Sequence, residues 1–187
     1  MAKRAGARIV GYAGEPGAFG ELACIARFPG HRRLPLAGFA QVVEAVADGR
    51  VARGLVPLRN SHAGRVPGVD ALLDDPAIRV AGRYRLPVAM HCLGLPGAEL
   101  HAVRAVHSHP VALRQSERFL DALGVERVPA RDTAWAARMI AEGGDPAVAA
   151  LGSARAAELY GLAVLAAQVQ DAADNVTTFA VVERALR

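Results

Sequence analysis

The sequence lacks the features that mark membrane, nucleic-acid-binding and zinc proteins. No apolar run approaches the ~20 residues that a membrane span requires. Lys3 is the only lysine, and the arginines are scattered, often beside acids, so the net charge of +4 forms no basic run that could follow a phosphate backbone. The two cysteines, Cys24 and Cys92, lie far apart without the ligand spacing of a structural zinc site. We therefore expect no membrane partner, no nucleic acid and no metal.

What the sequence does contain suits a compact globular protein. Of its 187 residues, 52% are hydrophobic, largely alanine and valine, and few are aromatic. A chain of this length can bury a real core as one domain or as two small lobes. It begins Met1-Ala2-Lys3-Arg4 with no continuous apolar segment behind the basic residues, so we expect no signal peptide and a cytoplasmic location.

Short apolar runs alternate with amphipathic stretches, which predicts an α/β fold. The predicted strands are 7–13, 54–58, 88–93, 103–107, 126–129, 147–151, 163–169 and 177–182, and the predicted helices are 19–28, 39–48, 66–73, 110–123, 134–142 and 154–160. We expect the chain to cross between two lobes at Leu86-Pro87 and to return near residues 168–175. Lobe 1 would then hold approximately 1–86 and 169–187, lobe 2 approximately 87–168, with a ligand cleft between them.

Polar residues follow the predicted strand 54–58. Asn60 and Ser61, with Gly64 close behind, place hydrogen-bond donors at the strand end where α/β sheets bind ligands. An ordinary turn closed by the asparagine or serine side chain is the alternative, and for these two residues alone it is the preferred interpretation.

A second polar group, Ser108-His109-Pro110, opens the helix that follows strand 103–107. Ser108 and the unpaired N–H groups at the start of that helix would make a seat for a carboxylate. A simple helix cap is the alternative. His107 and His109 alternate along the chain and so point to opposite faces, which weakens a metal site shared by the two.

The most informative stretch is Asp174-Asn175-Val176-Thr177-Thr178-Phe179. Two adjacent hydroxyls enter a β-branched strand here. Successive side chains of a strand point to opposite faces, so one of Thr177 and Thr178 can face a cleft while the other faces away.

Five segments, in order and spread over nearly the whole chain, resemble motifs of the prephenate dehydratase family. They are Gly14-Glu15-Pro16-Gly17-Ala18-Phe19-Gly20, Pro57-Leu58-Arg59-Asn60-Ser61, the run Ser108-His109-Pro110 with Ala112, Leu113 and Gln115, the run from Gly152 to Leu162, and Thr177-Thr178-Phe179. The sequence departs from the family at three positions. Gly20 stands where a hydroxyl residue is usual, Arg59 replaces a glutamate, and Thr178 replaces the arginine of the Thr-Arg-Phe motif.

The resemblance implies a two-lobed α/β fold like that of periplasmic binding proteins, with the active site between the lobes and no cofactor or metal. It implies a lyase of phenylalanine biosynthesis that converts prephenate to phenylpyruvate with loss of carbon dioxide and water. Arogenate is the alternative substrate, and homodimers or homotetramers are expected. Because the sequence stops soon after Phe179, we expect the family's regulatory phenylalanine-binding domain to be absent.

The resemblance also assigns roles to residues. Thr177 would be catalytic, as the hydrogen-bond donor to the leaving hydroxyl of the substrate. The substrate would be bound by residues of the matching motifs, which are Arg59, Asn60, Ser61, Gly64, Ser108, His109, Thr178 and Phe179.

Two other functions stay open. A prephenate decarboxylase would lose carbon dioxide without expelling the hydroxyl, and the missing motif arginine is compatible with it. A binding module for a small carboxylate would have kept the site and lost the chemistry. The retained Thr177 favours the dehydratase over both.

The changes at positions 59 and 178 form a pair, since an acid of the family and a base of the family are lost together. We hypothesise that Arg59 and Thr178 face each other across the cleft and form a relocated charge site for a substrate carboxylate.

Overall fold

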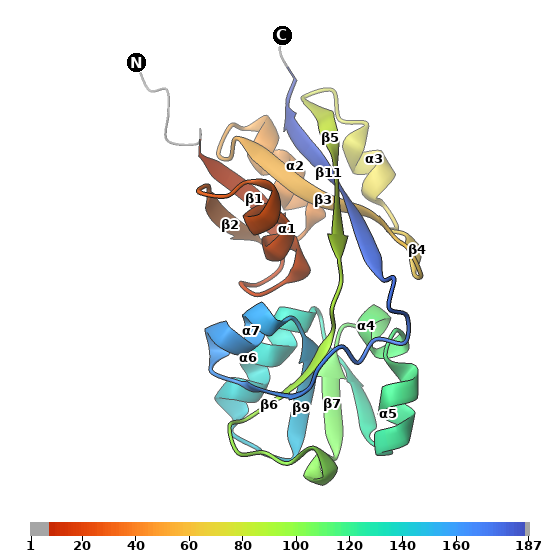
Figure 1. The fold of residues 1–187 in the computed structure, drawn as a ribbon. Helices are drawn as coiled ribbons and strands as arrows, with labels where there is room; N and C mark the ends of the chain where they lie inside the picture. Colours follow the sequence, from red (N-terminus) through yellow and green to blue (C-terminus); the bar gives the residue numbers. More distant parts are fainter. Residues whose placement is uncertain (1–7, 186–187) are drawn as a thin grey trace. The chain divides into compact units, whose positions relative to one another are not determined.

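A computed structural model describes residues 8–185 of the chain (Figure 1). Residue 7, at which the first predicted strand begins, lies outside the described residues, as does the start of the chain, where we expect no signal peptide. The chain divides into two compact units, each with its own sheet. Among the described residues, unit 1 holds 8–14, 19–87 and 176–185, and unit 2 holds 15–18 and 88–175.

Unit 1 is built on a mixed sheet with the strand order β2-β1-β3-β11-β5. Its strands are β1 (Ile9–Ala13), β2 (Arg32–Leu36), β3 (Arg53–Asn60), β5 (Ile78–Pro87) and β11 (Val176–Arg184), and the short β4 (Gly64–Arg65) pairs with β3. Strand β1 runs parallel to β2 and β3, whereas β11 runs antiparallel to both β3 and β5. Figure 1 shows β11, drawn in blue, between β3 and β5. The last strand of the chain therefore lies inside the sheet that the first strands form.

The two faces of this sheet bury different apolar side chains, because successive residues of β11 point in opposite directions. Phe179 and Val181 belong to a core formed with helix α1 (Phe19–Arg27). Ala180 and Val182 belong to a core formed with helix α2 (Phe39–Ala47) and helix α3 (Val69–Leu73). We call these sides the α1 face and the α2 face of the sheet.

Unit 2 has a five-stranded sheet in the order β10-β6-β9-β7-β8. Its strands are β6 (His91–Gly94), β7 (Ala105–Ser108), β8 (Glu126–Pro129), β9 (Val148–Gly152) and β10 (Ala163–Ala166), and its α-helices are α4 (Pro110–Arg114), α5 (Glu117–Leu123), α6 (Thr133–Gly143) and α7 (Ala154–Tyr160). Helix α6 is capped by Asp132, which accepts a hydrogen bond from Trp135 N at 2.7 Å, and α7 by Ser153, which accepts from Ala156 N at 3.0 Å. None of the helices among residues 8–185 is long and apolar enough to cross a membrane.

Residues 15–18 belong to unit 2 although they precede α1 in the chain. Ser153 Oγ donates to the carbonyl of Gly17 at 2.6 Å, and Tyr160 Oη donates to the carbonyl of Pro16 at 2.7 Å. Gly17 has a φ of +93°, and a Cβ added there would lie 2.9 Å from the Cα of Ala156. The glycine-rich segment thus needs glycine where its backbone packs against α7.

The return from unit 2 to unit 1 falls between Asn175 and Val176, at the end of the predicted range 168–175 and after the approximate lobe boundary at residue 169. Asn175 Nδ2 donates to Gln115 Oε1 at 3.1 Å, and the backbone carbonyl of Gln115 accepts from Asp171 N at 2.7 Å. The carboxylate of Asp171 accepts the N–H groups of Glu117 and Arg118, each at 3.1 Å. These bonds keep the connection in unit 2, and they also divide the predicted helix 110–123 into α4 and α5.

Close packing of α2 against the sheet depends on Gly54. A Cβ at this position would lie 2.5 Å from Val42 Cγ1 and 3.0 Å from Val182 Cγ2, whereas a Cβ at Gly82 in β5 would meet nothing within 4 Å. We predict that Gly54→Ala lowers the free energy of unfolding by about 1–3 kcal/mol, as overpacking of a core does. Gly82→Ala is the matched control and should change it by less than about 0.5 kcal/mol. Equal effects in urea denaturation would show that the helix does not pack as described.

Candidate active site

The side chains of Asn60 and Thr177 meet at one end of the β3–β11 pairing in unit 1. The register places Thr177 opposite Asn60, and Asn60 Nδ2 donates to Thr177 Oγ1 at 3.0 Å. The threonine oxygen therefore accepts a hydrogen bond from the amide, and its own proton can be donated to another acceptor.

The orientation of the Asn60 amide is fixed by the backbone. Its Oδ1 accepts from His62 N at 2.9 Å and from Ala63 N at 3.0 Å, so the side chain closes the turn between β3 and β4. Asn60 is buried, with 9% of its surface exposed. Since the oxygen is committed to the turn, the amide nitrogen must point toward Thr177. The turn and the contact with Thr177 are two roles of one side chain.

Ser61 and Gly64 complete the turn. Ser61 N donates to the carbonyl of Val176, and Val176 N donates to Ser61 Oγ, both at 2.9 Å. Gly64 has a φ of +81°, and a Cβ there would meet nothing within 4 Å. The turn is thus fastened to the start of β11 immediately before Thr177.

An apolar pocket of about 160 Å³ adjoins Thr177 within unit 1. Its lining residues are Ala13, Phe19, Gly20, Phe39, Leu55, Pro57, Thr177 and Phe179. Thr177 has the only polar side chain among them, and none carries a charge. Phe179 is 3% exposed and belongs to the core on the α1 face. The pocket can hold an apolar ring or chain with one hydrogen-bond donor beside it.

Phe19 and Phe39 were not among the predicted site residues. They open the helices α1 and α2, and in the sequence they are indistinguishable from core residues. Only the strand pairing that brings Thr177 beside them reveals their place in the pocket.

Thr178 points to the α2 face of the sheet, opposite to Thr177. The pairing of β11 with β5 is regular from Val176 to Val181, so Thr178 shares its face with Ala180 and Val182, which pack against α2. Thr178 is therefore not part of the pocket that adjoins Thr177. An arginine at this position would leave β11 on the same face as Thr178.

Arg59 is the cross-strand partner of Thr178. The register of β11 on β3 shifts at this point, since Thr178 pairs with Arg59 and Phe179 with Pro57, which leaves Leu58 as the extra residue of a β-bulge. Our hypothesis that Arg59 and Thr178 face each other across a cleft is therefore wrong. They are neighbours within one sheet, because the chain end returns to pair with β3.

The same row of the sheet holds two more arginines. Arg65 on β4 pairs with Arg59, and Arg85 on β5 pairs with Thr178. Arg65 forms an ion pair with Asp70 at 2.5 Å. A family glutamate at 59 and arginine at 178 would be directly opposite each other, as a cross-strand ion pair. With Arg59 in place, an arginine at position 178 would instead lie opposite a like charge. The uncharged Thr178 avoids this repulsion.

Ser108 and His109 lie in unit 2, at the end of β7 and the start of α4. Ser108 is fully buried, and its Oγ donates to the carbonyl of Leu151 at 2.9 Å. This hydroxyl joins the ends of β7 and β9, so it positions the loop that follows β7 instead of presenting itself as an open carboxylate seat.

His109 is the N-cap of α4, and its Nδ1 accepts from Val111 N at 3.2 Å. Burial lowers the pKa of His109 below its ordinary value of 6.5, and Arg114 lowers it further, while Asp132 opposes the shift. The neutral ring is the form that can accept this hydrogen bond at Nδ1. The alternative interpretation of this segment, a helix cap, is confirmed for His109; contact with a substrate stays a prediction.

Fold and geometry together define a two-sheet α/β protein with a candidate site for a small molecule. In unit 1, an oriented hydroxyl donor stands at a strand end beside an apolar pocket. Such a site can bind a ring and donate one hydrogen bond to an atom that gains negative charge.

The chain belongs to the prephenate dehydratase family, whose pattern it matches over residues 10–186. It is 41% identical over 179 residues to the bifunctional N-acyl-homoserine lactone acylase/prephenate dehydratase of Komagataeibacter europaeus, covering 96% of this chain and 64% of that protein. It is 35% identical over 175 residues to arogenate dehydratase/prephenate dehydratase 1, chloroplastic, of Arabidopsis thaliana, covering 94% of this chain and 45% of that protein. The chain thus spans less than two thirds of the length of these relatives.

The fold is also found in solved structures. The prephenate dehydratase of Arthrobacter aurescens in complex with L-Phe superimposes with a TM-score of 0.86 at 25% identity, covering 96% of this chain and 61% of that one. The predicted family and the predicted α/β class are therefore confirmed.

The pairing of Arg59 with Thr178 makes a testable prediction. Thr178→Arg alone should lower the free energy of unfolding, because it sets two arginines opposite each other, whereas Arg59→Glu with Thr178→Arg should restore it. We expect a coupling energy of about 0.2–1 kcal/mol in a double-mutant cycle measured by urea denaturation at low salt. Additive effects of the two substitutions would contradict the cross-strand contact.

Proposed function

We propose that the chain is a dehydratase that converts prephenate to phenylpyruvate, carbon dioxide and water. The observation that carries this proposal is the hydrogen bond from Asn60 Nδ2 to Thr177 Oγ1 at 3.0 Å, beside an apolar pocket. Membership of the prephenate dehydratase family supports it. Two curated relatives have this activity in their names.

The proposed reaction breaks two bonds to the ring of the substrate. The ring carboxylate leaves as carbon dioxide, and the electron pair of the broken C–C bond enters the ring. The ring becomes aromatic as the C–O bond to its hydroxyl breaks, and the departing hydroxide takes up a proton to become water. The substrate dianion and one proton thus yield the phenylpyruvate monoanion, carbon dioxide and water.

Thr177 is the proposed catalytic residue. Because its oxygen accepts from Asn60, its O–H bond is directed away from the amide and can donate to the leaving hydroxyl. A threonine hydroxyl is too weak an acid to give up its proton fully. It therefore acts as a placed donor that stabilises the negative charge on the departing oxygen, and water supplies the proton that is consumed.

The apolar pocket is the proposed seat for the substrate ring. Phe19, Phe39 and Phe179 line it and exclude water, which strengthens the hydrogen bond that Thr177 donates. Since no lining residue carries a charge, the substrate carboxylates must be bound by other groups. Ser61, the Gly64 turn and His109 remain our proposed binding residues, with Ser108 in a positioning role.

The substrate can be prephenate or arogenate, which differ by a keto and an amino group on the side chain. Names of the plant relatives include both activities, and no residue of the Thr177 pocket contains a charge that would choose between them. Cytoplasmic location and assembly as a homodimer or homotetramer stay predictions.

A second candidate activity is amide hydrolysis of an N-acyl-homoserine lactone. The relative from Komagataeibacter europaeus, 41% identical, has this activity in its name, and the apolar pocket beside Thr177 could hold an acyl chain. The decarboxylase and the binding module remain further outcomes of the same experiment.

The experiment is incubation of the protein with prephenate, and separately with arogenate, followed by absorbance and mass analysis of the products. We expect phenylpyruvate from prephenate. A non-aromatic keto acid formed with loss of carbon dioxide would identify a decarboxylase, and binding without turnover a binding module. Release of a free acid from an N-acyl-homoserine lactone would establish the second activity. Absence of both binding and turnover with prephenate would refute the proposal.

Variants at the two adjacent threonines test whether the hydroxyl of Thr177 is needed for catalysis. Thr177→Val keeps the shape of the side chain but removes the donor, and it should lower kcat by about 10²–10³-fold, as loss of one transition-state donor does. Thr178→Val is the matched control on the other face of the sheet and should change kcat by less than about threefold. Similar losses in the two variants would show that the hydroxyl of Thr177 has no special role.

A further inference from the structure

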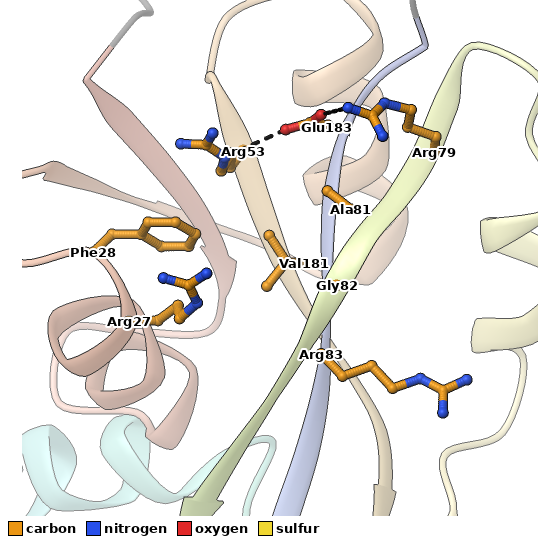
Figure 2. A pocket seen from close by; sticks show the side chains of 9 residues that line it. All are labelled: Arg27, Phe28, Arg53, Arg79, Ala81, Gly82, Arg83, Val181 and Glu183. Carbon is orange, nitrogen blue, oxygen red and sulfur yellow. Dashed lines mark hydrogen bonds and ion pairs between the residues drawn. The ribbon is translucent and has the colours of Figure 1, made fainter.

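A second and larger pocket of about 450 Å³ lies in unit 1, away from the Thr177 pocket (Figure 2). Its lining residues are Arg27, Phe28, Arg53, Arg79, Ala81, Gly82, Arg83, Val181 and Glu183. None of them belongs to the five motifs that identify the family.

Two of its arginines are held against one aromatic ring. The guanidinium carbons of Arg27 and Arg53 lie 5.0 Å and 5.3 Å from the centre of the Phe28 ring. Phe28 is itself buried, with 8% of its surface exposed, so the ring is a fixed support. Cation–π contact of this kind orders a guanidinium without neutralising its charge. The pocket therefore has cationic walls that are partly fixed in place before any ligand arrives.

Glu183 holds Arg53 and Arg79 on either side of β11 (Figure 2). Its Oε2 lies 3.4 Å from Arg53 Nε, and its Oε1 pairs with Arg79 Nη2. The carboxylate uses Nε of Arg53 and thereby leaves the two Nη groups of that guanidinium to other acceptors. No acidic side chain of the described part of the chain forms an ion pair with Arg27.

The charges of the pocket do not balance. Arg27, Arg53 and Arg79 contribute three positive charges and Glu183 one negative charge, which leaves an excess of two. Arg83 is not counted, because Figure 2 shows its side chain directed away from the other labelled side chains. It pairs with Ala180, whose side chain lies on the α2 face.

One wall of the pocket is formed by the backbone of β5 at Gly82, which has no side chain to fill the space. Val181 pairs with Gly82, and Val182 with Val80, so Ala81 is the extra residue of a β-bulge in β5. A Cβ at Gly82 would meet nothing within 4 Å, and the space above this glycine is part of the pocket. The bulge and the glycine together keep the volume between the arginines free of side chains.

We propose that this pocket binds a small dianion, through the charge that phosphate monoesters and dicarboxylates have in common. Planar guanidinium groups bind both kinds of anion through paired hydrogen bonds, and two negative charges match the excess in the pocket. The volume of about 450 Å³ lies within the range of small-molecule sites.

The pocket is distinct from the Thr177 pocket, although both use the same face of the same strand. Thr177 and Phe179 line one pocket, and Val181 and Glu183, further along β11, line the other. No residue lines both pockets, and the nearest lining residues on β11, Phe179 and Val181, are about 7 Å apart along the strand. A bound dianion would therefore contact a separate part of β11, and its binding does not depend on the proposed reaction.

The test is isothermal titration calorimetry at low salt, where charge is least screened, with phenyl phosphate, malonate and benzoate as probes. We expect a dissociation constant of about 1 mM or tighter for at least one of the two dianions, and binding of the monoanion benzoate weaker by about tenfold. Tighter binding of phenyl phosphate would identify the ligand class as phosphate monoesters, and tighter binding of malonate would identify it as dicarboxylates.

Three variants locate the site. Arg27→Gln should weaken binding of the dianion by about tenfold or more, because a charge-assisted contact is lost. Gly82→Val should do the same by filling the pocket without altering its charge, and it is expected to fold because its side chain meets open space. Arg85→Gln is the matched control, because Arg85 lies on the same strand, β5, but does not line the pocket.

Several results would overturn the proposal. These are no binding of either dianion at about 10 mM, binding that Arg27→Gln and Gly82→Val leave unchanged, or an equal loss in Arg85→Gln. The last result would mean that the anion follows the overall charge of the protein. Thermal unfolding of each variant confirms that it is folded, and the result of Gly82→Val decides the matter if Arg27→Gln does not fold.

Discussion

The pairing of β11 with β3 is the constraint on which the rest of unit 1 depends. It joins residues 117 positions apart in the chain and brings Thr177 onto Asn60. The same register sets Thr178 opposite Arg59 and distributes the side chains of β11 between two cores. The proposed chemistry and the exchange of motif residues are consequences of this antiparallel pair, whereas the arginine pocket also needs the pairing of β11 with β5.

The three departures from the family motifs lie in different parts of unit 1 and therefore have different consequences. Arg59 and Thr178 lie on the face of the sheet opposite to Thr177, so their exchange concerns the stability of strand pairing more than the reacting atoms. Gly20 lines the pocket beside Thr177. The absence of a side chain there leaves that pocket less polar than a hydroxyl residue would. Of the three departures, Gly20 is therefore the one nearest to the proposed catalytic residue. The sequence alone does not indicate this, because it does not show that Gly20 and Thr177 line the same pocket.

Much of the fold could be predicted from local pattern, and the site only in part. Strand 126–129 and helix 154–160 have the predicted bounds, because apolar periodicity and turn residues mark them clearly. Strand β5 was missed, since Arg79, Arg83 and Arg85 give an exposed edge strand the composition of a loop. Asn60 and Thr177 were identified separately. The contact between them could not be predicted, because it depends on how β3 and β11 are paired. Neither segment by itself determines the register or the bulge at Leu58.

Thr177 depends on the hydrogen bond that it accepts from Asn60 Nδ2, and kcat of Asn60→Asp with prephenate measures that dependence. Aspartate keeps an acceptor oxygen for the N–H groups of His62 and Ala63, but it has no N–H to offer Thr177 Oγ1 and would itself accept the threonine proton. We predict a fall in kcat of about 100-fold or more, with a thermal unfolding midpoint within about 4 °C of the unaltered protein. A kcat within about threefold of the unaltered protein would instead show that Thr177 acts without the amide of Asn60.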